Sequence, residues 1–212
     1  MPEVPRNRRR KQARPAEILA AALEEFSERG FAATRLDAVA ARAGISKGTL
    51  YLYFPTKEEL FKDMVRQTIL PMVAALDQTV GQATDSQRSA DLLRQVLTGL
   101  ALTLATSSAG RLPKLIVAEA TAFPDLAAFW AEEVIGRATA MLRRLIERGI
   151  SRGEFSAGET DPLLLFAPFL LMTLWNTAIA PATGRDIDPV SYTRQAVDLL
   201  LNGLLPRPEA LP

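Results

Sequence analysis

The chain has 212 residues, 48% of them hydrophobic, which is enough to build a core in one large domain or two small ones. Cysteine and histidine are both absent, and this excludes disulfides, thiolate nucleophiles, Cys/His zinc sites and imidazole bases. A Ser-His-Asp hydrolase would lack its central base. We therefore expect no enzyme, no metal site and no cofactor.

The formal net charge of +1 conceals an uneven distribution. Residues 1–60 carry 11 Lys and Arg against 8 Asp and Glu, whereas residues 61–212 carry 14 against 16. A basic N-terminal arm, residues 1–14, contains a single acid, Glu3, and suits a polyanionic partner, although a solvated tail without a role has the same composition. Its basic residues are Arg6, Arg8, Arg9, Arg10, Lys11 and Arg14.

Apolar residues recur at spacings of three and four along nearly the whole chain, without the alternation typical of strands. This pattern predicts an all-α protein of about nine helices. The first helix is expected to have Pro15 in its first turn and to end at Gly30, with Ile18, Ala22 and Phe26 on its buried face.

Capping signals predict the next helices. Thr34 is expected to cap a second helix that runs to about Ala43, with Asp37 in its first turn. Ser46 is expected to cap a short third helix that ends near Tyr53.

A T-x-x-E capping box, Thr56 to Glu59, predicts the start of a fourth helix that continues towards Val80 with a kink at Pro71. No flexible linker interrupts this stretch. The fourth helix should therefore belong to both halves of the chain and carry a tilt from one to the other.

Polar stretches divide the second half into further helices. The longest is expected from Pro124 to Gly149, and Asp161-Pro162 and Asp188-Pro189 repeat one start signal, an acidic cap followed by proline. The dividing stretches are 81–88, 105–111, 153–160 and 181–188.

The segment from Pro162 to Gly184 contains no charged residue and is long enough to span a bilayer. Pro168, Asn176 and Pro181 interrupt it, so we favour a helix buried on nearly all sides, between its own domain and a partner subunit. A membrane helix is the alternative. The chain begins with no secretory signal, which predicts a cytoplasmic protein without membrane attachment.

The most informative passage joins the second and third helices. Ala40 allows the helices to approach, Gly44 accepts a left-handed turn, and Leu50 anchors the second helix to the core. These features fit a helix-turn-helix, and they also fit an αα-corner with a solvated outer face.

The outer face of the third helix favours DNA binding. Gly48 permits close backbone approach, Thr49 and Tyr51 offer hydroxyls, Lys47 can reach a guanine or a phosphate, and Leu52 can touch thymine methyls.

The run GISKGTLYLYFPTKEELF resembles the helix-turn-helix signature of the TetR family, and the resemblance covers about residues 12–62. It implies that Lys47, Gly48, Thr49 and Tyr51 face the major groove. Arg35 and Leu52 depart from the family pattern, which puts base preference in question. The full set of expected DNA-binding residues is Thr34, Arg35, Ser46, Lys47, Gly48, Thr49, Tyr51, Leu52, Tyr53 and Lys57, with Tyr53 and Lys57 on the phosphate backbone.

The resemblance also implies a DNA-binding domain at 15–60 and a ligand-binding and dimerisation domain at 61–212. A homodimer through residues 162–180 and 190–205 would present two recognition helices to half-sites about 34–36 Å apart. The implied function is a repressor on a palindromic operator in double-stranded DNA, released by a small, largely apolar effector. The alternative is a membrane-associated or non-DNA-binding helical protein.

Large apolar residues in the second half could line the effector pocket, with Asn176 as a polar contact, although each fits a core or interface position as well. Glu119 is either an acid that meets a cation or an exposed helical residue; an enzyme using Glu119, Asp125 or Glu132 lacks a recognisable constellation. The candidate ligand-binding residues are Phe123, Phe129, Trp130, Met141, Phe169, Met172, Trp175 and Asn176.

Overall fold

The computed structural model describes residues 6–156, 158 and 160–204, and their side chains from residue 15 onward. The described residues are helical, as expected, and divide into two compact units. Unit 1 comprises Met1–Thr68 and Leu115–Phe129, and unit 2 comprises Ile69–Lys114 and Trp130–Pro212. Several helical segments follow one another directly. If each such run is counted as one helix, and α4 with α5 as another, the described residues contain the expected nine helices.

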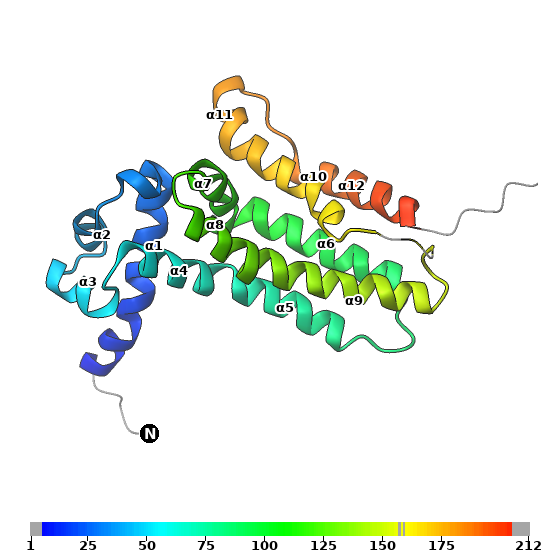
Figure 1. Cartoon of the computed structure of the whole chain (residues 1–212), viewed down its shortest axis with the longest axis horizontal. Helices are drawn as coiled ribbons and strands as arrows, with labels where there is room; N and C mark the ends of the chain where they lie inside the picture. Colours follow the sequence, from blue (N-terminus) through cyan, green and yellow to red (C-terminus); the bar gives the residue numbers. More distant parts are fainter. Residues whose placement is uncertain (1–5, 157, 159, 205–212) are drawn as a thin grey trace, which may run out of the picture. The chain divides into compact units, whose positions relative to one another are not determined.

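Unit 1 contains a helix-turn-helix packed on a long first helix (Figure 1). Helix α1 packs against both α2 and α4, and α2 packs against α3. The end of α7 and most of α8 belong to the same unit. The helices are α1 (Arg6–Ala33), α2 (Leu36–Arg42), α3 (Lys47–Tyr53), α4 (Lys57–Thr68), α7 (Arg111–Glu119) and α8 (Pro124–Trp130).

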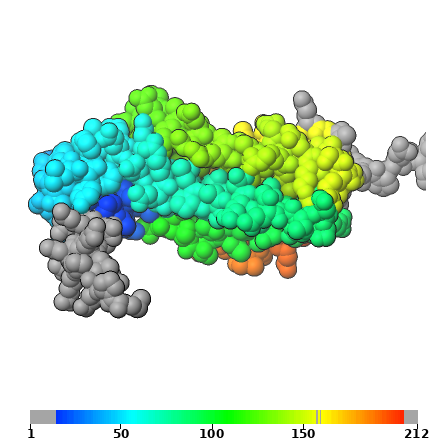
Figure 2. Space-filling model, turned by 90° about the horizontal axis from the view of Figure 1, so that it is seen from below, coloured from blue at the N-terminus to red at the C-terminus, as the bar shows by residue number. Residues whose placement is uncertain are grey.

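Unit 2 is a helical bundle in which α6 is the central helix, because α5, α9, α10 and α12 all pack against it. In Figure 2 the side chains of α5 and α9 meet along one face of this unit. Its segments are α5 (Leu70–Gly81), α6 (Ser89–Thr106), η1 (Ser108–Gly110), η2 (Ala131–Gly136), α9 (Arg137–Ser151), α10 (Leu163–Leu174), η3 (Trp175–Ile179), α11 (Ala180–Thr183) and α12 (Pro189–Leu204).

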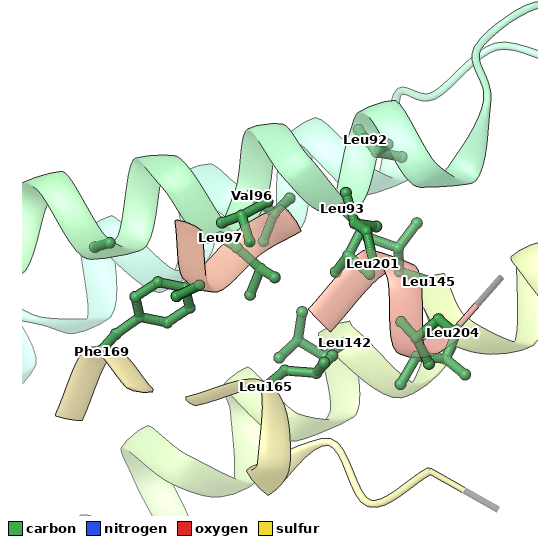
Figure 3. Packing of buried hydrophobic residues seen from close by; sticks show 14 of the residues in the cluster. Leu92, Leu93, Val96, Leu97, Leu142, Leu145, Leu165, Phe169, Leu201 and Leu204 are labelled. Atoms are coloured by element: carbon green, nitrogen blue, oxygen red, sulfur yellow. The ribbon is translucent and has the colours of Figure 1, made fainter. Parts of the chain in front are cut away.

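The core of unit 2 is built from leucine-rich faces of α6, α9, α10 and α12 (Figure 3). Leu97, Leu142 and Phe169 are completely buried there, and each buried side chain of this size contributes roughly 1.5–3 kcal/mol. Its labelled members are Leu92, Leu93, Val96, Leu97, Leu142, Leu145, Leu165, Phe169, Leu201 and Leu204.

The beginning of the chain differs from the expectation in one respect. Helix α1 starts at Arg6, so Pro15 lies inside it and not in its first turn. Gly30 ends the regular helix as predicted, with φ +80° and ψ 166°. The side chains of the basic arm, residues 1–14, lie outside the described residues.

The fourth helix expected from the sequence is kinked near Pro71, as predicted, and forms two helical segments, α4 and α5, with Ile69 between them. Pro71 explains the break, because it cannot donate a hydrogen bond to the carbonyl of Gln67 and its ring crowds that carbonyl. The boundary between the two units falls at the same place, between Thr68 and Ile69.

The expected caps of the other helices are confirmed at most positions. The Thr49 amide donates to Ser46 Oγ at 3.1 Å, the Glu59 amide to Thr56 Oγ1 at 3.1 Å, and the Ser191 amide to Asp188 at 2.8 Å. The last contact lowers the pKa of Asp188. Proline 162 precedes α10 rather than opening it.

One segment of the described chain, Leu163–Thr183, is long and apolar enough to cross a membrane, and 28% of its most apolar window is buried. This segment is therefore not buried on nearly all sides within a single chain. The expectation had assigned part of the burial to a partner subunit.

Gly149 was expected to end the long helix, but α9 continues to Ser151. The reason for the glycine is packing. A Cβ at this position would lie 2.1 Å from Cδ2 of Phe155, whose ring is buried in the core of unit 2.

Replacing Gly149 with alanine should lower the free energy of unfolding by roughly 1–3 kcal/mol, because the added methyl group overlaps a buried ring. Urea denaturation followed by circular dichroism measures this change. Gly136→Ala is the matched control, since Gly136 is exposed and its Cβ would meet only an ordinary contact at 3.5 Å. Equal stability of the two variants would contradict the packing explanation.

Candidate nucleic-acid interface

The turn between α2 and α3 has the geometry of a helix-turn-helix. Gly44 has φ +65°, a conformation that glycine adopts without strain, and the Ile45 amide donates to the carbonyl of Ala40 at 3.0 Å. Ala40 and Leu50 are buried, as the steric argument predicted. The turn therefore fixes α3 with one face in the core and the other outside.

The outer face of α3 carries the residues that the sequence assigned to DNA. Leu52 is 85% exposed, Tyr51 41% and Tyr53 36%, and Gly48 is exposed beside them. Two aromatic hydroxyls and an apolar side chain are thus presented to solvent from one short helix. Such a surface can donate to phosphates or base edges and contact thymine methyl groups.

Thr49, one turn into α3, is partly engaged by the helix itself. Its hydroxyl lies 2.8 Å from Ser46 Oγ, which also accepts the Thr49 amide. Ser46 therefore caps α3 and orients Thr49 at the same time.

Lys47 is held by an acid of α2. Its Nζ lies 2.9 Å from Oδ1 and 3.1 Å from Oδ2 of Asp37, and 5.7 Å from the centre of the Tyr51 ring. The hydrogen bond to Asp37 raises the pKa of Lys47. The guanidinium of Arg35 approaches the same carboxylate at 3.9 Å. From the sequence, Asp37 was assigned only to the first turn of a helix.

Thr34 occupies a different place from the one expected. Its side chain is buried, and its hydroxyl donates to the carbonyls of Glu25 and Gly30, at 3.1 and 2.7 Å. Arg35, without a capping side-chain bond, is the residue that precedes α2. The predicted N-cap at Thr34 is therefore wrong, because the hydroxyl bonds back to α1, and Thr34 leaves the set that can face DNA.

Lys57 is also engaged inside unit 1. Its ammonium donates to the carbonyls of Phe31, Ala32 and Thr34, at 2.7, 3.0 and 3.2 Å, and lies 4.5 Å from the centre of the Phe31 ring. An ammonium has three donors, so each has a carbonyl partner here. A phosphate contact by Lys57 would require it to release part of this set.

Helices α1 and α2 are joined by ion pairs around the buried Glu25. Arg42 on α2 donates to Glu25 at 2.8 Å and to both oxygens of Glu28, and these bonds raise the pKa of Arg42. Arg29 lies 3.1 Å from the other oxygen of Glu25. A buried carboxylate with two cationic partners fixes α2 against α1.

Residues 115–129 dock on the helix-turn-helix within unit 1. The Glu119 carboxylate accepts the amide of Phe31 at 2.9 Å and that of Ala32 at 3.4 Å, directly after the break at Gly30. A Cβ at Gly30 would lie 2.6 Å from Glu119 Oε1. Glu119 was expected either to meet a cation or to be exposed; it instead binds two backbone donors in a half-buried position.

Aromatic contacts reinforce this docking. The ring of Phe123 meets that of Phe31 edge to face at a centroid distance of 4.8 Å. Phe129 is buried, with the cationic groups of Lys62 and Arg66 at 5.6 and 5.2 Å from its ring centre.

The eight candidate ligand-binding residues do not form one group. Phe123 and Phe129 belong to unit 1, while the other six belong to unit 2. Met141, Phe169 and Met172 are buried in the core of unit 2.

Trp130, at the end of α8, is half-buried, and the polar groups of Trp175 and Asn176 bind the chain itself. Trp175 donates to the carbonyl of Arg185 at 2.7 Å, and the Asn176 amide exchanges two hydrogen bonds with the backbone of Ile187, at 2.8 and 2.9 Å. The polar contact offered by Asn176 is thus used to hold the loop before α12.

A pocket of about 510 Å³ lies in unit 2 at the end of α9, and none of the eight candidates lines it. Its lining residues are Arg143, Ile146, Glu147, Ile150, Gly158, Thr160, Asp161 and Leu164.

Comparison with known families accounts for both halves of the chain. The family described as bacterial regulatory proteins, tetR family, matches residues 18–64, and the tetracyclin repressor-like C-terminal domain matches residues 81–200. The chain belongs to the TetR family. Proteins of this family are helix-turn-helix transcriptional regulators, and this supports the expected regulator class over a membrane-associated or non-DNA-binding protein.

Curated relatives are similar mainly in the DNA-binding region. The transcriptional regulator RutR of Escherichia coli K12 is 47% identical over 57 residues, which are 27% of this chain and 27% of RutR. YfiR of Bacillus subtilis, an uncharacterised transcriptional regulator, is 27% identical over 161 residues, 76% of each chain. The chain thus covers about a quarter of RutR, the first of these relatives.

Solved structures share the TetR fold over nearly the whole chain. FadR, the fatty acid degradation regulator of Bacillus halodurans, has a TM-score of 0.72 at 20% identity, covering 90% of this chain and 96% of its own. FadR of Bacillus subtilis in complex with stearoyl-CoA has 0.67 at 18% identity, covering 89% and 98%. SmeT, the repressor of a Stenotrophomonas maltophilia multidrug efflux pump, has 0.69 at 23%, covering 93% and 97%.

Glu119→Ala should open the turn after Gly30, because the Phe31 amide loses a charged acceptor worth roughly 1.5–3 kcal/mol. Hydrogen exchange at Phe31 and Ala32 should become at least about tenfold faster. Glu119→Gln keeps an acceptor oxygen and should restore most of the protection. Glu58→Ala, on the exposed side of α4, is the control. Unchanged exchange in Glu119→Ala would show that this contact does not hold the turn.

Proposed function

We propose that this protein is a TetR-type repressor that binds a palindromic operator through α3 and is released by a small, largely apolar effector. The observation that carries the proposal is the outer face of α3, where Tyr51, Leu52 and Tyr53 are exposed on a helix fixed by a buried Leu50 and a capping Ser46. We expect the protein in the cytoplasm, where such an operator is located.

Within this proposal the contacts divide by chemistry. Lys47, Thr49 and Tyr51 are assigned to base edges, with Gly48 allowing the backbone to approach, and Leu52 to thymine methyl groups. Tyr53, Ser46 and Arg35 are assigned to phosphates. Arg35 is 82% exposed in its side chain, which supports a role in reaching the backbone.

Lys47→Ala and Tyr51→Ala should each weaken operator binding by about five- to hundredfold, the usual cost of one base contact. Fluorescence anisotropy with DNA from upstream of the protein's own gene measures this, at several salt concentrations because phosphate contacts make binding salt-dependent. Arg144→Ala is the control, since Arg144 is an exposed cation of unit 2. Wild-type affinity in both variants would show that α3 is not the recognition helix.

The dimer is assigned to α10 and α12. Both helices expose large apolar side chains, as an isologous interface requires. Leu199 is 74% exposed and Leu164 60%. The full exposed set on these helices and η3 is Leu163, Leu164, Leu170, Leu171, Ile179, Val190 and Leu199.

The double variant Leu164→Glu, Leu199→Glu should be a monomer at micromolar concentration, because two charges would be buried in each half of the interface. Sedimentation velocity measures the mass, and operator affinity should fall because only one half-site is read at a time. Val117→Glu is the control, since Val117 is 59% exposed but lies on α7. A dimer that persists in the double variant would place the interface elsewhere.

The effector is proposed from its chemical class. The interior of unit 2 is built of large apolar side chains, and the structurally similar FadR of Bacillus subtilis binds stearoyl-CoA. Stearoyl-CoA is therefore the first probe to add to the anisotropy assay, with free coenzyme A as its polar control.

A further inference from the structure

An acidic side chain, Asp37, lies among the residues assigned to DNA. It contacts Lys47 at 2.9 Å and approaches Arg35 at 3.9 Å, and its side chain is 43% exposed. A carboxylate in this place meets the phosphates of an approaching duplex with a charge of the same sign. A negative charge here cannot serve general attraction to DNA, so Asp37 must act in another way.

The other cations of residues 15–60 have contacts that tie them to the fold. Arg29 and Arg42 hold the buried Glu25, and Lys57 donates to three carbonyls of the turn before α2. Arg35 and Lys47 are the two whose described contacts are with Asp37. Asp37 therefore controls the most accessible positive charge in this part of the protein.

We propose that Asp37 is a specificity-determining residue, whose carboxylate fixes Lys47 for a base contact and disfavours binding to phosphates alone. The proposal rests on the proposed function. The lysine ammonium has three donors, and two oxygens of Asp37 lie within hydrogen-bond distance of it. A third donor remains for one acceptor, such as O6 or N7 of guanine.

The two kinds of complex use this pair differently. On non-specific DNA, affinity comes from phosphates, so Lys47 must leave Asp37 or bring the carboxylate close to the duplex. On the operator, Lys47 keeps its bond to Asp37 while it reads a base. The carboxylate thus weakens the first complex and orders the second.

Asp37→Asn is the decisive variant, because it removes the charge with little change in shape. Affinity for a duplex of random sequence should rise about fivefold, and the slope of log K against log salt should steepen by about 0.9 for each phosphate gained. Operator affinity should change by less than about twofold, because the loss of order at Lys47 is offset by the loss of repulsion between the Asp37 carboxylate and the phosphates. The ratio of the two affinities should therefore fall.

Two further variants separate charge from folding. Asp63→Asn removes a carboxylate that is also 43% exposed in unit 1 and paired with Arg66 at 3.0 Å, and should leave the affinity ratio unchanged. Asp37→Glu keeps the charge and should preserve low affinity for random DNA. Thermal unfolding of each variant shows whether the fold is intact. If Asp37→Asn is unfolded, Asp37→Gln, which also removes the charge, should give the same rise in affinity for random DNA.

The outcomes decide the proposal. Equal effects of Asp37→Asn and Asp63→Asn on random DNA would overturn it. A fall in operator affinity with unchanged binding to random DNA would also overturn it, and would make Asp37 a base contact that accepts from cytosine. A wild-type protein without operator preference would contradict the proposed function, and the salt slope on random DNA would still decide whether Asp37 opposes phosphates.

Discussion

The backbone of Phe31 is the point on which unit 1 depends. The break at Gly30 turns the chain so that the Phe31 amide meets Glu119 while its carbonyl meets Lys57. Its ring is buried among aromatic neighbours in the same unit. Those neighbours are Phe26, Phe61 and Phe123, at centroid distances of 5.5, 5.5 and 4.8 Å. Because the amide, the carbonyl and the ring of Phe31 are all held, the start of α2 is fixed. The position of α3 after the following turn is fixed with it.

Charge within the helix-turn-helix is used mainly to hold it together. The salt bridges of Arg42 and the carbonyl contacts of Lys57 join separate elements, and an exposed ion pair alone would add little stability. The outward surface of α3 carries hydroxyls, a glycine, an exposed leucine and Lys47 paired with Asp37, groups that can distinguish bases by shape and hydrogen bonding. Residues 1–14 contain six basic residues, a composition that suits a polyanionic partner.

Local signals in the sequence predicted the helical fold and the turn between α2 and α3 well. Ser46, Gly44 and Thr56 act through neighbours within a few residues, so their roles follow from composition and spacing. The roles of Lys57 and Glu119 could not be predicted in this way, because each depends on a backbone group far along the chain. Thr34 was misassigned for another reason, since its hydroxyl bonds back to α1 and does not cap α2. The contact of Glu119 with Phe31 spans 88 residues. Gly149 shows the same limit, since the ring that requires it becomes visible only in the packed core.

The long helix that contains η2 has a change of phase that the regular spacing of apolar residues conceals. Buried positions follow at Leu126 and Phe129, then after a step of five at Val134, and from Ala138 resume intervals of three and four. A π-helical turn absorbs the additional residue. A relative with one residue fewer here would have an uninterrupted α-helix, and its side chains beyond this point would face the same way as those of α9. Without the π-helical turn, the additional residue would rotate them by about 100°. Sequence alignments of this family should therefore allow a single-residue gap inside η2. If gaps were allowed only in loops, every residue of α9 would be aligned with the wrong residue of such a relative.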